Sequence, residues 1–313
     1  MNEQLRLPLV GAAGIESFRE GGYKNTAHAT AELVDNSIQA NAKNVGIYLF
    51  FSTRNGRQYV DNIIVADDGD GMDLKTFEKA LTFASGTRLG NTRGLGRYGM
   101  GLPNSSVSQT KLFKVYTWQT SNGTKQTLYN YMDLDEIRET NDPYLKFPEH
   151  NPEHIRGGKL DIIDTLNADN GTIVIWENPD RIKPLTVRPL VSHLDKHLSR
   201  MFRYYITGFQ DNGTERKTNI TIKMIDYNGQ SYSQTNNDHK VKPFDPLFIM
   251  EDTQTMETFP DEDFNGVTSK THAVVDESFS DGNDDHSITM IFSHLKKEVR
   301  DKITGNPGDT PLG

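Results

Sequence analysis

Residues 31–40 read AELVDNSIQA, a stretch that places an acid and an amide one helical turn apart. Glu32 and Asn36 would share one face of a helix, where a carboxylate and an amide can hold a water molecule and a metal ion side by side. Apolar residues recur at helical spacing on a different face and predict a helix over residues 27–40. These apolar residues are Ala27, Ala31, Val34 and Ile38. A polar face on a surface helix is the alternative interpretation.

A second motif, DDGDGM at residues 67–72, directly follows the apolar run 63–66, which we expect to be a strand. The acid Asp67 at the strand end can accept a hydrogen bond from the exocyclic amine of adenine, and the glycines let backbone approach the base closely. A calcium loop is excluded in both possible registers, because glycines or a lysine stand where oxygen ligands are needed. An acidic turn stays open as an alternative.

Glycines dominate the third motif, since residues 85–101 contain six of them, and we expect this segment to be a mobile loop. Its last part, GRYGMG at residues 96–101, leads into an expected helix. Glycines before a helix N-terminus expose amide donors and a positive dipole end, which together can cradle phosphate. The pattern alone also fits a flexible loop. No G-x-x-x-x-G-K-[ST] sequence occurs and no βαβ unit of suitable spacing surrounds the glycines, which excludes a P-loop and a dinucleotide fingerprint.

The remaining sequence alternates expected strands and helices, which predicts an α/β fold. Asp73 is expected to cap a helix over residues 73–83, and a longer helix is expected over 187–205. Asn-Gly pairs at 55–56 and 122–123 predict hairpins. A Gly171-Thr172 pair, uninformative alone, opens one of the later strands. The expected strands cover residues 45–51, 59–66, 111–120, 125–132, 172–176, 220–226, 272–275 and 287–292.

The chain has 313 residues and a formal net charge of −9, from 34 Lys and Arg against 43 Asp and Glu. This length predicts about two domains of a globular protein. The lack of cysteine excludes a disulfide scaffold, a thiolate metal site and a cysteine nucleophile. No apolar run reaches the length of a membrane span and no signal sequence is present, so we expect a cytoplasmic protein without membrane contact. The acidic balance argues against coating of nucleic acid by bulk charge.

Two other polar clusters are expected to be solvated helix faces. His193 and His197 have the spacing of metal ligands, but the sequence between them lacks the glutamate of H-E-x-x-H. A basic cluster near the C-terminus could contact DNA, although a solvated face is the simpler interpretation. Its members are Lys296, Lys297, Arg300 and Lys302.

The four motifs E-x-x-x-N, D-x-G-x-G, G-x-x-G-x-G and Gly-Thr occur in this order between residues 20 and 180. In this order the chain resembles the GHKL ATPases, a family that includes gyrase B subunits, MutL, heat-shock chaperones, histidine kinases and MORC proteins. Residues 31–40 and 94–106 are most similar to MORC-type and related bacterial ATPases. The resemblance implies an α/β sandwich with a Bergerat-type nucleotide-binding domain, in which a mixed sheet carries helices on one face.

The resemblance implies ATP and Mg²⁺ as cofactors and assigns a role to each motif. Glu32 corresponds to the general base that polarises the attacking water, Asn36 to the Mg²⁺ ligand, and Asp67 to the acid that binds adenine. Thr172 corresponds to a residue that supports adenine through water, and Arg88 stands where relatives often have a lid lysine. The implied nucleotide-binding positions are Asn36, Asp67, Gly69, Gly71, Met72, Arg88, Gly96, Gly99, Met100, Gly101 and Thr172.

The resemblance also implies a domain organisation: an N-terminal arm at 1–22, an ATP-binding domain at 23–182 with a lid at 85–101, and a transducer-like domain at 183–313 that we expect to be truncated. In relatives ATP binding drives formation of a homodimer, and DNA or a DNA-associated complex is the target expected by analogy. A heat-shock-type chaperone ATPase and a slow-turnover nucleotide-binding scaffold are the alternatives. A histidine kinase is disfavoured, because a helical hairpin bearing its phospho-accepting histidine would have to precede Glu32.

Overall fold

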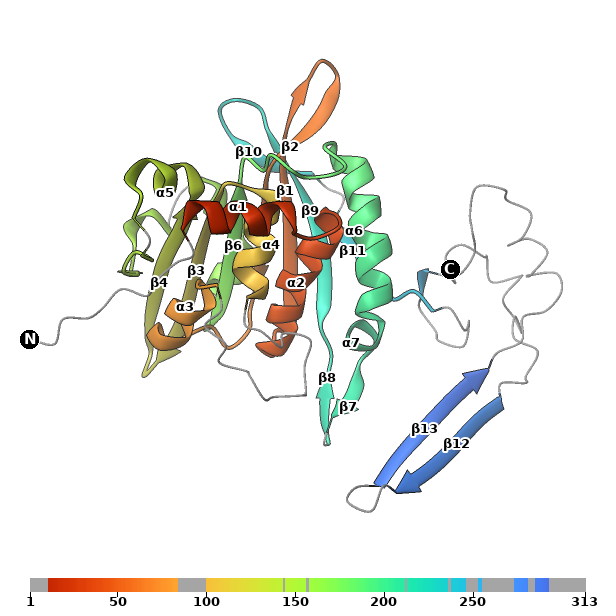
Figure 1. The fold of residues 1–313 in the computed structure, drawn as a ribbon. Helices are drawn as coiled ribbons and strands as arrows, with labels where there is room; N and C mark the ends of the chain where they lie inside the picture. The colour runs from red at the N-terminus through yellow and green to blue at the C-terminus, as the bar shows by residue number, and fades with distance from the viewer. Residues whose placement is uncertain are drawn as a thin grey trace, which may run out of the picture. The chain divides into compact units, whose positions relative to one another are not determined.

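A computed structural model gives the fold of the chain (Figure 1), which divides into two compact units, Met1–Val241 and Lys242–Gly313. The structure describes residues 11–83, 100–142, 144–155, 158–211, 213–235, 238–245, 253–254, 273–280 and 285–292.

The first unit is built on a nine-stranded sheet in the order β10-β9-β1-β2-β6-β3-β4-β5, with β11 also paired to β9. The sheet is mixed, because β1 and β9 run parallel while the other neighbours are antiparallel. Its strands are β1 (Asn44–Arg54), β2 (Arg57–Asp67), β3 (Leu112–Ser121), β4 (Thr124–Asp133), β5 (Glu149–His150), β6 (Gly171–Glu177), β9 (Asn219–Tyr227), β10 (Tyr232–Gln234) and β11 (His239–Lys240).

Both predicted Asn-Gly hairpins are confirmed. Asn55 and Gly56 join β1 to β2, and Asn122 and Gly123 join β3 to β4, with all four residues at positive φ. Two consecutive residues at positive φ are the requirement of a type I′ turn, whose twist matches that of the flanking strands. The Asn-Gly pairs therefore fix the register of four of the strands.

The helices of this unit are α1 (Ala12–Glu20), α2 (Thr26–Gln39), α3 (Leu74–Ala80), α4 (Gly101–Gln109), α5 (Leu134–Thr140), α6 (Val187–Met201) and α7 (Arg203–Thr207). Figure 1 shows α1, α2, α4 and α6 on one side of the sheet. Three short 3₁₀ segments, η1 (Glu153–Ile155), η2 (Gly158–Ile162) and η3 (Asp164–Asn167), precede β6. The predicted fold class, a mixed sheet with helices on one face, is confirmed.

Successive side chains of β1 point to opposite faces of the sheet and contribute to an apolar core on each face. Ile47 and Leu49 join the larger apolar cluster, to which α2, α4 and α6 also contribute. Tyr48 and Phe50 point to the opposite face and join a second cluster, which includes Leu160 of η2. All four β1 side chains are at most 1% exposed, so the central strand is buried on both faces.

The first compact unit extends further along the chain than the nucleotide-binding domain that we expected to end at residue 182. Strand β9, expected in the second domain, pairs in parallel with β1 over eight residues. Helix α6 packs against α2, and the short hairpin of β7 (Phe209–Asp211) and β8 (Thr214–Arg216) follows α7. The unit therefore ends at Val241. A transducer-like character of residues 183–313 stays a prediction.

In the second unit, the described residues include an antiparallel pair of strands, β12 (Ala273–Ser280) and β13 (Asp285–Phe292). Both correspond to strands expected from the sequence, although β12 is longer than the expected 272–275. The basic cluster at 296–302 lies outside the described residues.

Candidate functional site

Helix α2 carries the first motif. Its N-cap is Asn25, whose side chain accepts a hydrogen bond from the backbone N–H of His28, and this cap starts the helix where the apolar stripe begins. The stripe packs against the sheet, with Val34 fully buried. Glu32 and Asn36 are half-buried on the same helix. Both side chains therefore come from a rigid element whose orientation is fixed by the core.

The carboxylate of Glu32 lies against the first residue of α4. A Cβ atom added at Gly101 would be 2.7 Å from Oε2 of Glu32 and 3.8 Å from Nδ2 of Asn36. The side chains of Glu32 and Asn36 thus lie directly against the start of α4. Burial raises the pKa of the Glu32 carboxyl, the nearby Asp35 raises it further, and a hydrogen bond from Tyr23 lowers it.

Asp67 ends β2 and is 5% exposed. Its Oδ2 accepts a hydrogen bond from Ser37 Oγ at 2.8 Å, and its Oδ1 accepts one from the backbone N–H of Gly69 at 2.9 Å. Burial raises the pKa of Asp67 to about 6, against the opposing effect of these two bonds. Because Ser37 directly follows Asn36 on α2, its bond joins the second motif to the first.

The glycines of the second motif are required by close contacts. A Cβ atom at Gly69 would lie 2.7 Å from the carbonyl oxygen of Ala40, and one at Gly71, where φ is +65°, would lie 2.2 Å from the carbonyl oxygen of Trp118. The backbone N–H of Met72 then donates to Thr117 Oγ1 at 2.9 Å. The turn is therefore held between the end of α2 and strand β3.

Thr172 lies beside Asp67, because the two residues are partners in the register of β2 and β6. Thr117 of β3 is the partner of Thr172 on the other side, and the two hydroxyl oxygens are 3.2 Å apart. Thr117 is fully buried, whereas Thr172 is partly exposed. A carboxylate and two hydroxyl groups thus stand in a row across three neighbouring strands.

The third motif is described only at its end. Met100 is the N-cap of α4 and Gly101 is its first residue, as expected, and the Met100 side chain makes no capping hydrogen bond. Within the described part of the chain, the N-cap side chain therefore leaves the first N–H groups of α4 available to a ligand. Arg88, Gly96 and Gly99 lie outside the described residues.

Three residues near this site were not predicted from the sequence: Tyr23, Ser37 and Thr117. Ser37 and Thr117 act on Asp67 or its neighbours across elements that are distant in the sequence. Their contacts depend on strand register and on helix packing, for which the sequence contains no local signal. Tyr23 lies in the turn before α2, and its ring packs against the larger apolar cluster.

The residues of the site fit a magnesium ion. The Asn36 amide has no hydrogen-bond partner among the described residues and is half-exposed next to Glu32. Mg²⁺ retains several waters and is commonly held by few protein oxygens together with substrate phosphates. Such a site needs no cluster of three histidine, aspartate or glutamate residues, and the described part of the chain contains no cluster of this kind.

A separate pocket of about 770 Å³ lies at the other end of the strands. It is lined in part by Arg54, Asp61 and Lys159. Asp61 is six residues before Asp67 on β2, which corresponds to about 20 Å along the strand. This pocket therefore shares no residue with the candidate site.

Glu32 and Asn36 on α2 and Asp67 at the end of β2 thus lie close together in the first unit, linked through Ser37. Residues 23–165 match the sequence model of a family described as histidine kinase-, DNA gyrase B-, and HSP90-like ATPases. That part of the chain is therefore similar to the GHKL ATPases.

One solved structure similar to the chain is the crystal structure of the N terminal domain of a DNA repair protein. The two share 15% sequence identity, with a TM-score of 0.43, and the alignment covers 84% of this chain and 64% of the other chain. The chain therefore spans less than two thirds of that structure. A comparison with curated proteins gives no match. Among the described helices, each is too short or too polar to cross a membrane.

Proposed function

We propose that this protein is a Mg²⁺-dependent ATPase of the GHKL type, with its active site between α2, the end of β2 and the start of α4. One observation carries the proposal: the hydrogen bond from Ser37 to Asp67 places the acid of the second motif beside the helix that bears Glu32 and Asn36. The base and the phosphates of a single nucleotide could thus contact both motifs.

Adenine is the base that Asp67 would select. Its carboxylate is buried and its two oxygens are oriented by Ser37 and Gly69, so an unused lone pair can accept the exocyclic amine of adenine. Guanine would place a carbonyl oxygen there, leaving two buried acceptors without a donor. Thr172, with its hydroxyl next to Thr117, is placed to support the base through a water molecule.

Hydrolysis would take place at Glu32. Its carboxylate lies at the start of α4, where uncapped N–H groups can receive phosphate oxygens, and burial raises its pKa toward the range useful to a general base. Asn36 would hold Mg²⁺, which supplies charge neutralisation at the phosphates. Glu32 would orient the attacking water and accept its proton.

The first test replaces Glu32, the proposed general base. Glu32→Ala should bind ATP with wild-type affinity but lose most of its turnover, because general base catalysis contributes about 10²–10⁴-fold. Steady-state hydrolysis and nucleotide binding by calorimetry measure the two effects separately. Glu20→Ala, which removes an exposed acid at the end of α1, is the matched control. Wild-type hydrolysis by Glu32→Ala would rule out Glu32 as the base.

We further propose that the nucleotide cycle gates dimerisation and that the protein is MORC-like, cytoplasmic and active on DNA or on a DNA-associated complex. Support for this comes from the order of the motifs, which is shared with gyrase B subunits, MutL and MORC proteins. GHKL proteins often dimerise, and an ordered lid would present a new surface only in the ATP state. DNA as the target rests on this family analogy.

A further inference from the structure

The hydroxyl group of Thr117, on β3, has three hydrogen-bond neighbours beside the candidate site. The backbone N–H of Met72 donates to Thr117 Oγ1 at 2.9 Å, and the Gly171 carbonyl oxygen accepts from it at 3.1 Å. The third neighbour is Thr172 Oγ1, which is 3.2 Å away. Because the Thr117 side chain is fully buried, these three contacts define the hydrogen bonding of its hydroxyl group.

Only one arrangement of the hydrogen atoms satisfies all three contacts. A hydroxyl group has one hydrogen to donate and two lone pairs that accept. A backbone N–H can only donate and a carbonyl oxygen can only accept, so Thr117 donates to Gly171 and accepts from Met72. The second lone pair of Thr117 then accepts the hydrogen of Thr172. The Thr172 hydroxyl group therefore has only its lone pairs left for a ligand.

Thr172 is partly exposed and is the register partner of Asp67 at the end of β2. The Asp67 oxygens accept hydrogen bonds from Ser37 and Gly69, and an ionised carboxylate has no hydrogen to donate. A ligand group that meets both Asp67 and Thr172 must therefore be a donor. The exocyclic amine of adenine fulfils this requirement, whereas a carbonyl oxygen at the same position would face acceptors on both strands.

We propose that Thr117 is a positioning residue for Thr172: it holds the Thr172 hydroxyl group as an acceptor and thereby makes the site select a purine with an amine over one with a carbonyl group. This inference rests on the proposed function, because it takes Asp67 and Thr172 as the residues that face the base. Without the Thr117 hydroxyl group, Thr172 can turn its hydrogen towards the ligand and donate to a carbonyl oxygen. The selectivity of the site therefore depends on a residue that does not contact the nucleotide.

The test compares ADP with inosine diphosphate, which has a carbonyl oxygen in place of the amine. Neither nucleotide has a γ-phosphate to be hydrolysed, so calorimetry gives the ratio of their dissociation constants directly. The measurement is made at pH 8, where Asp67 is ionised. Thr117→Val keeps the branched shape and removes the hydroxyl group. It should lower the preference for ADP about threefold to tenfold, the size expected for one neutral hydrogen bond.

A second substitution at the same position separates this role from a structural one. Thr117→Ser keeps the hydroxyl group but loses a buried methyl group, so it should lower the stability to urea and still retain the full preference for ADP. Structural damage by Thr117→Val would weaken the binding of both nucleotides equally and leave the ratio unchanged. Thr127→Val, at a buried threonine of the neighbouring strand β4, is the matched control.

A double-mutant cycle with Thr172 completes the test. Thr172→Val leaves the bonds of Thr117 to Met72 and Gly171 in place, and it should lower the preference for ADP as Thr117→Val does. In the Thr172→Val background, Thr117→Val should cause no further change.

Three results would overturn the role of Thr117: an unchanged preference in either valine variant, a loss of preference in Thr117→Ser, or additive effects in the double variant. Equal affinity of the unmutated protein for ADP and inosine diphosphate would instead contradict the proposed adenine site, and this inference with it.

Discussion

At the residue scale, the buried carboxylate of Asp67, which is proposed to bind adenine, lowers the stability of the folded protein when it is ionised. The folded protein holds the Asp67 proton up to about pH 6, whereas the unfolded chain releases it near the ordinary value of 3.8. The ionised form therefore destabilises the fold. This destabilisation is absent below pH 3.8, grows as the pH rises and is complete above pH 6.

Asp67→Asn should consequently raise the free energy of unfolding at pH 8 by on the order of 2 kcal/mol, and by less at pH 5. ATP affinity should fall sharply. With Asn Oδ1 accepting from Gly69, the amide NH₂ would meet the amine of adenine as a second donor. Urea denaturation at the two pH values and nucleotide calorimetry measure these effects. A variant less stable than wild type at pH 8, or one with unchanged ATP affinity, would contradict this account of Asp67.

The positions of individual residues could be predicted where they belong to a short, continuous sequence motif. Gly71 has the positive φ, and Gly101 the close approach, that the D-x-G-x-G and G-x-x-G-x-G patterns imply. The roles of Ser37 and Thr117 were not predictable, because a serine in a helix and a threonine in a strand have many ordinary uses. Only the packing of α2 on the sheet and the register of β3 with β6 give them partners in the site.

At the element scale, sequence patterns predicted α2, the two Asn-Gly hairpins and the Asp73 cap of α3. They did not predict that β9 joins the same sheet. A parallel pair such as β1 and β9 is closed by a long connection, and no turn sequence sets its register. The boundary near residue 183 followed a local Asn-Pro-rich stretch, whereas the extent of the unit depends on this distant pairing.

The contact between α2 and α6 also differs from expectation. We expected His197 on a solvated face, but its ring packs against that of His28, with centroids 4.0 Å apart and the planes tilted by 39°. Its Nε2 is buried without a hydrogen-bond partner in the described part of the chain. Burial, together with the charges of His28, His193 and Arg200, lowers the pKa of His197 to about 4. The helix that carries Glu32 is thus joined to α6 by a pair of histidines that favours the neutral form.

Acid should weaken this contact between the helices. The unfolded chain protonates His197 near pH 6.5, while the folded protein resists protonation down to about pH 4, so the free energy of unfolding falls as the pH drops through this window. His197→Phe keeps an aromatic ring against His28 and should lose less stability than wild type between pH 7 and pH 4.5. His150→Gln, at an exposed position on β5, is the control. Equal losses in wild type and His197→Phe would exclude His197 as the titrating group.

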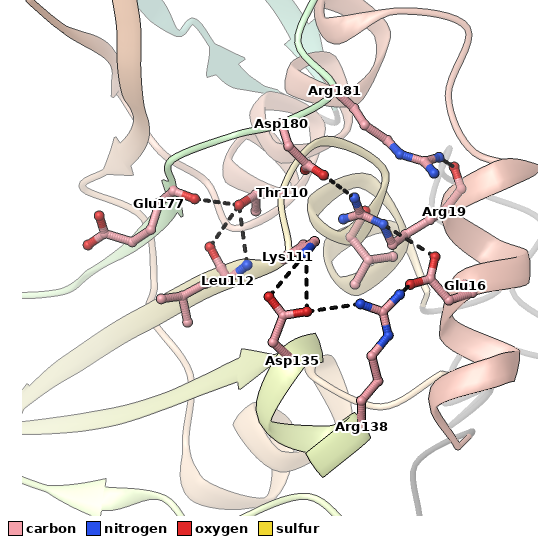
Figure 2. Close-up of polar contacts among 11 residues, drawn as sticks. Glu16, Arg19, Thr110, Lys111, Leu112, Asp135, Arg138, Glu177, Asp180 and Arg181 are labelled. Atoms are coloured by element: carbon pink, nitrogen blue, oxygen red, sulfur yellow. Dashed lines mark hydrogen bonds and ion pairs between the residues drawn. The ribbon is translucent and has the colours of Figure 1, made fainter.

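At the scale of the whole molecule, α1 is an integral part of the first unit. Figure 2 shows its Arg19 reaching Asp180, at 2.6 Å, with Arg181 donating to the Arg19 carbonyl oxygen at 2.7 Å. Glu16, also on α1, pairs with Arg138 of α5. Arg19 is 4% exposed and also donates to the Val107 carbonyl oxygen of α4. Deleting α1 would also remove Ile15, which is fully buried in the larger apolar cluster, so α1 cannot be deleted without harm to the fold.

This anchoring decides how the predicted arm at residues 1–22 should be tested. A deletion through residue 19 would remove Arg19 and leave Asp180 without its cation, so loss of a dimer could result from damage to the unit. A deletion of residues 1–10 ends before α1 and keeps its contacts with α4 and α5. Only this shorter deletion separates an arm that crosses to a second subunit from a helix that stabilises its own.

The corresponding prediction is an ATP-dependent dimer that requires residues 1–10. In the Glu32→Ala background, which should retain bound ATP, light scattering should give a dimer with ATP and a monomer with ADP or without nucleotide. Binding shifts the equilibrium only by the difference in ATP affinity between the two states. The 1–10 deletion should abolish the dimer while thermal stability and ATP affinity stay at the level of the full chain. A dimer of equal strength in all three nucleotide states would remove the basis for gating. A dimer indifferent to the deletion would assign the contact to a surface other than the arm.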